Sequence, residues 1–473
     1  MPATRNLSNL IIFRNSQGLQ ARGSLLKLSR TNLIFEVYNP YSIVQLSEVL
    51  NEMEIRSGER VIYNGRAVVT NLVNTGLMLI TSARLLDAWS DLRGVIGDKS
   101  RVQKEVVFFI EDWQASHQIR PHYQLAVSRI RSFLTELNCW LEHVDIESDP
   151  SDRPPNTQDQ RELLTSLAEP LVPRLAEMFA RFEEVAAQIP EDERPTHTRY
   201  VQRDLHPLLL RAPFIHRAYH KPLGYAGDYE MVNMMLREPQ EGPTIYAQII
   251  NTQYVGSGTC QAHRNRIDIL VQWLRERIGK ALERGQQPSI LNIGCGPAIE
   301  LQHLIRSEPL LAQCLIRLVD FSAETLEYTK GKLEEASQTS GIRPKIEYCH
   351  DSVHKLLKRA SQKREEEGAE NFDIVYCAGL FDYLSDRVCS RLLGLFCQWG
   401  GPESEILATN VHPSNPTRYC MEYLLEWHLV YRDERQMRQI SENLGPREIF
   451  VDQTGINVFL KIYKGKNVDS NAR

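Results

Sequence analysis

The sequence predicts an α/β protein in which a small N-terminal β-barrel and a helical region precede a doubly wound C-terminal domain. Two patterns predict this order. Short runs rich in β-branched residues fill the chain to about residue 95, and helical spacing of apolar residues follows from about residue 100. From Pro288 onward, strand-like runs alternate with amphipathic segments. We therefore expect three domains, over residues 1–98, 99–260 and 261–473.

The composition excludes several classes of protein. Of 473 residues, 42% are hydrophobic and 24% are charged, which is typical of a globular chain with two to four domains. The formal charge of −5 provides no overall basic field to bind nucleic acid or an anionic membrane. No apolar run reaches the roughly 18 residues of a membrane span, and the N-terminus lacks a signal peptide's apolar centre. We expect a cytoplasmic protein with no nucleic-acid partner.

The cysteines and histidines follow no metal or disulfide pattern. Nine cysteines are scattered without a C-x-x-C pair, which fits neither a zinc site nor a disulfide framework. His216 and His220 have metal-ligand spacing for a helix, but no third ligand of the H-E-x-x-H kind accompanies them. We predict free thiols, mostly in the core, and no metal.

The first part of the chain reads as a small barrel or sandwich. Its strand-like runs are separated by Gly, Asn and Ser and lie at 11–15, 23–30, 33–39, 60–73 and 77–83. This segment resembles the PilZ domain, a bacterial barrel that binds cyclic dinucleotides through an arginine motif and a D/N-x-S-x-x-G motif. At the second motif this chain has KLSRTN, without the first acidic or amide residue and the last glycine. The degenerate motif favours a docking or dimerisation module over a dinucleotide site.

The middle of the chain predicts helices. Apolar residues recur at three- and four-residue spacing through 106–144 and 163–188. Polar, proline-containing stretches at 146–160 and 189–198 predict loops, and a further helix runs from about residue 262 to 284. We expect this region to be a lid, a homodimer interface or both.

The C-terminal part predicts a parallel sheet that ends in an antiparallel hairpin. Its apolar runs lie at 289–294, 316–322, 345–351, 372–379, 405–411, 447–452 and 456–464. Amphipathic segments follow the first five runs, as in a doubly wound sheet. A tight Gln-Thr-Gly turn joins the last two, so these pair as a hairpin.

A glycine-rich turn follows the first of these strands. Gly294 and Gly296 let the backbone approach a ligand closely, and the next helix adds N–H donors. A dinucleotide fingerprint would have a third glycine at Ile299. Asp320 ends the second strand, 24 positions after Gly296, where a ribose-binding carboxylate is expected. Taken singly, Asp320 also suits a helix N-cap, and Cys295 a small buried side chain.

Two further features occupy corresponding strand ends. Asp351 and Ser352 end the third strand, where they can read an adenine edge, and small Ala378 and Gly379 leave room after the fourth. Together these features resemble the class I S-adenosylmethionine (SAM)-dependent methyltransferases, over about residues 262–465. The resemblance implies a Rossmann-like, seven-stranded methyltransferase domain and SAM as the cofactor.

The same resemblance assigns cofactor contacts. By it, Gly294, Gly296 and Pro297 flank the methionine moiety, and Asp320 binds the ribose hydroxyls. Phe321 packs on the adenine, and Asp351 and Ser352 meet the edge of that ring. Ala378 leaves room for the cofactor. Asn292 stands where many members have a carboxylate that orders the amino group, and an amide cannot supply that charge. Arg264 or Arg266, on the preceding helix, compensates by binding the cofactor carboxylate, or is a solvated helix charge.

Three segments indicate a narrower family: HKPLGYAGDYEMVNMM at 220–235, QAHRNRIDILVQWL at 261–274 and TNVHPSNPTRYCMEYLLEWHLVYRDE at 409–434. They resemble the bacterial methyltransferases that make 3-hydroxypalmitic acid methyl ester, an extracellular quorum signal. The resemblance covers residues 213–465 and implies methyl-ester formation on the carboxylate of a 3-hydroxy fatty acid or similar small acid.

The chemistry of such a substrate is simple. A carboxylate with a pKa near 4 to 5 is ionised at neutral pH and needs no general base, so positioning carries catalysis. The candidates for substrate contact follow strands four and five or lie in the Gly-Tyr-Ala-Gly-Asp loop: Tyr225, Tyr383, His412, Trp427 and Arg432. The candidates for an acyl channel, which also suit plain core packing, are Phe214, Met231, Met234 and Met235.

Two alternatives remain open from the sequence. The acceptor can be a hydroxyl or an amine, which requires a base such as His412 or Tyr225. The chain can instead be a cyclic-dinucleotide-responsive signalling module with a vestigial methyltransferase fold. The degenerate KLSRTN motif argues against the second alternative, and the intact glycine turn with Asp320 argues that a cofactor site is in use.

Overall fold

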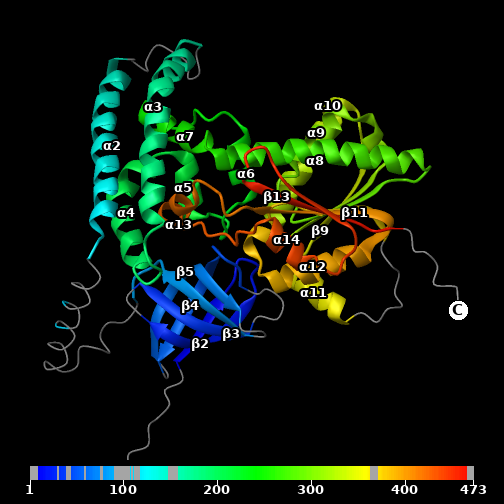
Figure 1. The fold of residues 1–473 in the computed structure, drawn as a ribbon, viewed down its shortest axis with the longest axis horizontal. Helices are drawn as coiled ribbons and strands as arrows, with labels where there is room; N and C mark the ends of the chain where they lie inside the picture. Colours follow the sequence, from blue (N-terminus) through cyan, green and yellow to red (C-terminus); the bar gives the residue numbers. More distant parts are fainter. Residues whose placement is uncertain are drawn as a thin grey trace, which may run out of the picture.

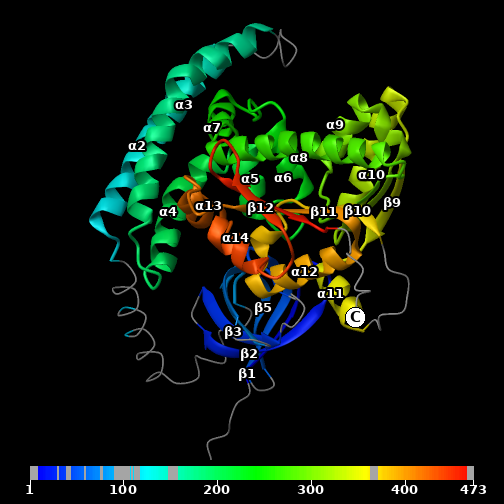
Figure 2. The ribbon, with the colours of Figure 1, turned by 45° about the vertical axis from the view of Figure 1, so that its right-hand side comes forward.

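The computed structural model describes residues 9–28, 31–38, 44–57, 60–74, 78–89, 107, 110, 118–147, 158–362 and 371–465. Figure 1 shows the barrel beneath the helical region, with the sheet and its helices to the right. Figure 2 shows the barrel from a second side, where it lies below the junction between the helical region and the C-terminal domain. Side-chain contacts agree, since Val430 packs on the barrel core and Arg84 of the barrel pairs with Glu426 at 2.9 Å.

Six antiparallel strands of the described residues close into a barrel in the order β1-β2-β3-β6-β5-β4. Their bounds are β1 Asn9–Arg14, β2 Gln20–Leu28, β3 Asn32–Tyr38, β4 Val49–Ser57, β5 Arg60–Asn74 and β6 Met78–Leu85. The predicted barrel is confirmed. The sequence does not predict β4, because a bulge between Leu50 and Met53, with Glu52 at φ 47°, breaks the alternation of side chains. Ser29 and Arg30 of the KLSRTN segment lie outside the described residues.

The middle region is helical, with α2 and α3 side by side at one end of the molecule (Figure 1). The bounds are α2 Pro121–Glu147, α3 Gln158–Ala186, α4 Arg194–Leu209, α5 Pro213–His220, α6 Tyr229–Leu236, α7 Ile245–Val255 and α8 Gly258–Glu283. Residues 106–117 of the first predicted helix lie outside the described residues, apart from 107 and 110. The loop predicted at 189–198 is wrong from Arg194 onward, because Pro195 occupies the first turn of α4, where its missing N–H is not needed.

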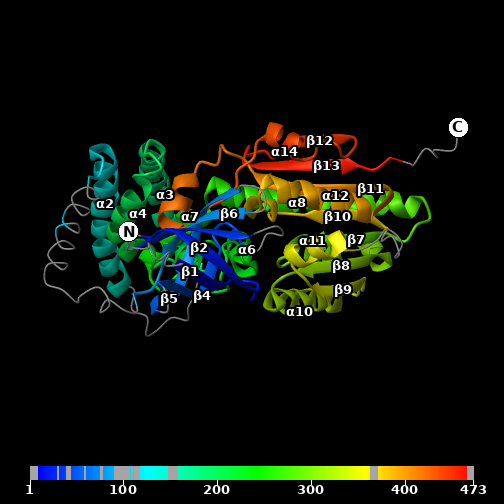
Figure 3. The same cartoon turned by 90° about the horizontal axis from the view of Figure 1, so that it is seen from below.

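Seven strands of the described C-terminal part form a mixed sheet in the order β12-β13-β11-β10-β7-β8-β9, seen from top to bottom in Figure 3. They are β7 Ser289–Ile293, β8 Leu315–Asp320, β9 Lys345–His350, β10 Phe372–Cys377, β11 Gly400–Val411, β12 Arg447–Val451 and β13 Asn457–Tyr463. β13 is antiparallel to both of its neighbours, whereas the other pairs are parallel. The predicted strands and the terminal hairpin are confirmed.

Helices cover both faces of this sheet. Along β10, Ile374 and Tyr376 pack in a core cluster with α8, α9 and α10, while Val375 and Cys377 pack in a second cluster with α11, α12 and α14. The remaining bounds are α9 Ile299–Ser307, η1 Pro309–Gln313, α10 Ala323–Ser340, α11 Val353–Gln362, η2 Phe381–Tyr383, α12 Asp386–Trp399, α13 Arg418–Leu425 and α14 Glu434–Ile440. Burial on both faces explains why β10 reads as a continuous apolar run. Among the described helices, none has the length and apolar character needed to cross a membrane.

One buried arginine holds together the segments beyond β10 and β11. The Arg432 guanidinium, 1% exposed, donates to the carbonyls of Phe381 and Leu384 at 2.8 and 2.6 Å, and to Asn410 Oδ1 at 2.7 Å. It also donates to the Asp386 carboxylate at 2.7 and 2.9 Å. Without the guanidinium, the Leu384 carbonyl and Asn410 Oδ1 would lose this buried donor, and buried unpaired acceptors are costly.

We expect Arg432→Met to lower the free energy of unfolding by about 3–5 kcal/mol, because it strands these buried acceptors. The measurement is urea unfolding followed by circular dichroism. Arg435→Met, at an exposed position of α14, is the matched control and should change stability by less than about 0.5 kcal/mol. Equal effects of the two substitutions would contradict the assigned role.

Candidate functional site

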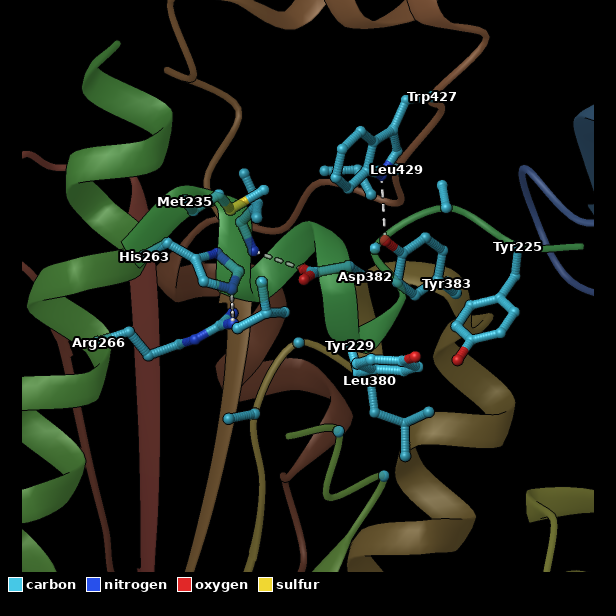
Figure 4. A pocket seen from close by; sticks show the side chains of 18 of the residues that line it. Tyr225, Tyr229, Met235, His263, Arg266, Leu380, Asp382, Tyr383, Trp427 and Leu429 are labelled. Carbon is cyan, nitrogen blue, oxygen red and sulfur yellow. Dashed lines mark hydrogen bonds between the residues drawn. The ribbon is translucent and has the colours of Figure 1, made fainter. Parts of the chain in front are cut away.

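A cavity of about 210 Å³ lies at the carboxyl ends of β7, β8 and β10. The glycine turn after β7 forms one wall, and helix α8 forms another. The loop before α6 and the segment after α13 enclose the remaining sides. Figure 4 shows His263 and Arg266 of α8 on one side of this cavity and Tyr225 on the other, with Asp382 and Tyr383 between them.

The glycine turn is fastened to the end of β8 by Asp320. One carboxylate oxygen accepts from the Gly296 N–H at 3.1 Å and the other from the Ser322 N–H at 3.0 Å. Gly294 and Gly296 have φ of 68° and 51°, in the left-handed region that favours glycine. The N-cap of α10 is Ser322, whose hydroxyl accepts from the Thr325 N–H, so Asp320 is not the cap. Burial raises the pKa of Asp320, which lines the cavity.

A carboxylate stands beside Asn292 after all, supplied by Glu300 in the first turn of α9. Asn292 Nδ2 donates to Glu300 Oε1 at 3.2 Å, and the Tyr376 hydroxyl donates to the same oxygen at 2.7 Å. Burial raises the pKa of Glu300, which is 5% exposed and lines the cavity with Asn292. Sequence reasoning missed Glu300. The signal for it in the sequence was an acidic residue one helical turn after the glycines, at a position where a helix otherwise turns apolar side chains toward the core.

Arg266 reaches the cavity and Arg264 does not. A Cβ built on Gly379 would lie 3.1 Å from Arg266 Nη1, so the guanidinium lies against the backbone after β10. Its Nη2 donates to His263 Nε2 at 2.5 Å, while its Nε has no partner. Burial lowers the pKa of both side chains. Arg264 instead donates to the Val255 carbonyl at 2.8 Å. His263 was not among the sequence candidates.

Aromatic side chains close the opposite side. The Trp427 indole N–H donates to the Tyr383 hydroxyl at 3.0 Å (Figure 4). A Cβ on Gly227 would lie 2.6 Å from that hydroxyl, so the loop before α6 tolerates no side chain there. Tyr225 packs edge-on against Phe321, with ring centroids 4.8 Å apart. Burial raises the pKa of the Tyr225 and Tyr383 phenols, so both stay protonated at neutral pH.

Asp382 is a cavity residue that the sequence reasoning missed. Its carboxylate is 4% exposed and accepts from the Val411 N–H at 2.7 Å. Burial raises its pKa to about 6, although Arg266 and Arg432 act in the opposite direction. Only the folding of β11 beside η2 brings these groups together, so no local sequence pattern reveals the site.

Of the other residues predicted to bind the cofactor, some line the cavity and some do not. Pro297 and Ala378 line the cavity with the residues above. Asp351 and Ser352 do not, because Asp351 pairs with Arg359 of α11 and the Ser352 hydroxyl accepts from the Lys355 N–H in the first turn of that helix. The Asp351 N–H does donate to the Asp320 carbonyl at 2.9 Å, next to the site.

Two catalytic candidates also lie away from the cavity. His412 Nδ1 is hydrogen-bonded to Ser414, and its Nε2 is 3.4 Å from Glu434, so the imidazole is engaged outside the cavity. Arg432 is the buried structural arginine described above. Tyr225, Tyr383 and Trp427 are the catalytic candidates that the fold brings together.

The acyl-channel candidates and the histidine pair also have defined places. Phe214 and Met235 line the cavity, whereas Met231 and Met234 are buried in the helical core. His216 and His220 are exposed and stacked, with ring centroids 4.1 Å apart. They lie outside the cavity.

No family model and no curated protein matches this chain. Among solved structures, it is similar to a possible exported protein from Bordetella parapertussis, at 16% identity and TM-score 0.39, over 53% of this chain and 86% of that one. It is also similar to magnesium protoporphyrin IX methyltransferase from Synechocystis PCC 6803 with bound SAH, at 13% identity and TM-score 0.35, over 53% and 98%. An O-methyltransferase family protein from Burkholderia thailandensis matches at 12% identity and TM-score 0.34, over 57% and 71%. At such identities and TM-scores, these likenesses assign no activity to this chain.

The raised pKa of Asp382 predicts that ionisation of this carboxyl destabilises the folded protein, by an amount that depends on pH. Between about pH 4 and pH 6 the native carboxyl keeps a proton that the unfolded chain has lost, so the free energy of unfolding falls as pH rises through this window. Asp382→Asn removes this destabilisation. We expect the stability of the variant relative to the parent to rise by about 3 kcal/mol between pH 4 and pH 7.

The measurement is urea unfolding at several pH values. Asp192→Asn, at an exposed position, is the matched control for the removal of one carboxylate. A pH-independent difference for Asp382→Asn would contradict the assigned burial.

Proposed function

We propose that this protein is a SAM-dependent methyltransferase that forms a methyl ester on the carboxylate of a small apolar acid, such as a 3-hydroxy fatty acid. The observation that carries the proposal is that a single cavity joins polar groups at the strand ends to an apolar chamber. Ligands bind at the carboxyl ends of strands in sheets of this kind. The narrower acceptor comes from the family resemblance of the 220–235, 261–274 and 409–434 segments.

The polar end of the cavity fits the groups of SAM. The Asp320 carboxylate suits the ribose hydroxyls, and the Phe321 ring suits the adenine. Glu300 and Arg266 provide a carboxylate and a guanidinium for the amino and carboxylate groups of the methionine moiety, and the Arg266 Nε is a buried donor without a partner. When bound, SAM supplies an electrophilic methyl group on a sulfonium sulfur.

The rest of the lining fits an apolar acceptor. The apolar side chains at this end come from the helical region and from the segment after α13, and they include Phe214, Met235, Met421, Leu425 and Leu429. Methionine and leucine adapt to flexible chains. The phenol of Tyr383, which stays protonated, would donate a hydrogen bond to an acceptor oxygen.

Such an acceptor needs positioning more than proton transfer. An ionised carboxylate attacks the methyl group directly, and holding its oxygen in line with the carbon–sulfur bond supplies roughly 7–11 kcal/mol of the barrier in favourable cases. Trp427, which is 6% exposed, lines the cavity and would help to exclude water from the nucleophile. A hydroxyl or amine acceptor would need a base. Of the two that the sequence indicated, His412 lies outside the cavity and the Tyr225 phenol holds its proton, whereas the buried imidazole of His263 does line the cavity.

We expect the purified protein to convert SAM and straight-chain or 3-hydroxy fatty acids into methyl esters and S-adenosylhomocysteine. The measurement is mass spectrometry of a reaction with a mixed pool of acids, which also ranks acyl lengths. kcat should stay constant from about pH 7 to 9, above the pKa of Asp382, because no base has to lose a proton. Bound SAM without ester would exclude fatty acids, and a fall in kcat below a histidine pKa would favour a hydroxyl or amine.

We expect Asp320→Ala to weaken SAM binding by at least about tenfold in a calorimetric titration, because hydrogen bonds to a charged carboxylate contribute about 1.5–3 kcal/mol each. Asp351→Ala is the comparison, since this carboxylate ends the neighbouring strand but pairs with Arg359. It should change the affinity by less than about threefold. Unchanged affinity in a folded Asp320→Ala variant would remove the cofactor assignment.

A further inference from the structure

The barrel contributes directly to the cavity. Gln45, Leu46 and Glu48, in the turn that precedes β4, line it together with residues of the other two parts of the chain. Leu46 is 8% exposed and belongs also to the core cluster of the barrel. One side of this leucine therefore packs in the barrel, and another side faces the cavity.

The 45–49 turn is bonded to two other cavity walls. The Val49 N–H donates to the Gly224 carbonyl at 2.8 Å, which ties the turn to the loop that carries Tyr225 and Gly227. The Ser47 hydroxyl donates to the His428 carbonyl at 2.9 Å and accepts from the His428 N–H at 2.5 Å. His428 lies between Trp427 and Leu429, which both line the cavity. The turn is thus adjacent to the aromatic side of the chamber.

The turn is also held rigidly within the barrel. The Glu48 carboxylate, 1% exposed, accepts from the Ser16 N–H at 2.8 Å, from the Ser16 hydroxyl at 2.5 Å and from the Gln45 N–H at 2.8 Å. Ser47 is fully buried at φ 60°, a conformation that persists only where surrounding contacts enforce it. A fixed turn forms a wall of defined shape.

A second anchor joins the same two bodies. Arg84 of β6 pairs with Glu426 at 2.9 Å and donates to Gln202 at 2.9 Å, while Gln202 donates to Glu426 at 2.8 Å. Glu426 directly precedes Trp427, so this network also fixes the segment that carries the indole. Buried polar groups that are hydrogen-bonded to one another in this way favour a single arrangement of the parts they join.

We propose that the 45–49 turn of the barrel is the end wall of the acceptor chamber and that Leu46 sets the length of the apolar acceptor, an inference that rests on the proposed function. The barrel is then part of the acceptor site. Enlarging residue 46 shortens the chamber and reducing it lengthens the chamber, while the glycine turn and Asp320 at the cofactor end are unaffected.

The test uses the full chain with Leu46→Trp and Leu46→Ala. Leu50→Ala is the matched control, because Leu50 is fully buried in the barrel core but does not line the cavity. SAM affinity should stay within about threefold of the parent in all three variants. Among straight-chain acids of graded length, the ratio of kcat/KM for long over short acids should fall at least about tenfold in Leu46→Trp and rise in Leu46→Ala. Leu50→Ala should keep the parent's ratio.

An unchanged length profile in both Leu46 variants would overturn the proposal, as would the same change in Leu50→Ala.

If the parent methylates no acid, the acceptor class has failed, and the wall is tested by binding of 1-anilinonaphthalene-8-sulfonate with saturating S-adenosylhomocysteine. Leu46→Trp should then weaken saturable probe binding at least about tenfold, whereas Leu50→Ala should bind the probe as tightly as the parent protein does. Equal affinity in Leu46→Trp, or no saturable binding to the parent, overturns the proposal.

Discussion

The hydrogen bonds from the Gly296 and Ser322 N–H groups to the Asp320 carboxylate are the constraint on which the candidate site depends. They fix the turn after β7 to the end of β8, so two adjacent parallel strands deliver their polar groups to one place. The same turn starts α9, whose first residues carry Glu300 toward Asn292. A charged acceptor that serves two backbone donors holds such a turn more firmly than a neutral one.

A second level of order comes from the barrel, which is bonded to segments that are distant in the sequence. Its 45–49 turn contacts the Gly224 loop and the His428 segment, and neither of these belongs to the regular strands of the sheet. Loops at strand ends have few partners of their own and open at low cost in free energy. Packing the barrel against both loops gives them partners and keeps the cavity enclosed.

The fold could be predicted where short-range pattern decides it. Each of the seven C-terminal strands is an apolar run between breakers, and the glycines, Asp320 and the terminal hairpin follow from spacing. The pattern failed at β4, where a bulge disrupts alternation, and at Arg194, where a proline starts a helix instead of ending one. The residues of the candidate site likewise include some that the sequence predicted and some that it did not. His263 and Asp382 come together only through the packing of α8 and η2, so no spacing in the sequence reveals them. Glu300 had a signal in the sequence, an acidic residue one turn after the glycines.

Charge burial gives a physical reason for the arrangement of the cavity. Glu300 and Asp382 each interact with the charge of Arg266, and burial opposes the charged form of all three side chains. A buried guanidinium with an unpartnered Nε is costly unless a ligand anion completes it. A zwitterionic ligand group would supply an anion to Arg266 and a cation to Glu300 together, which relieves both burial costs at once. Under the proposed function, these groups would match the amino acid moiety of SAM, and the apolar chamber beside them would select the acceptor by shape.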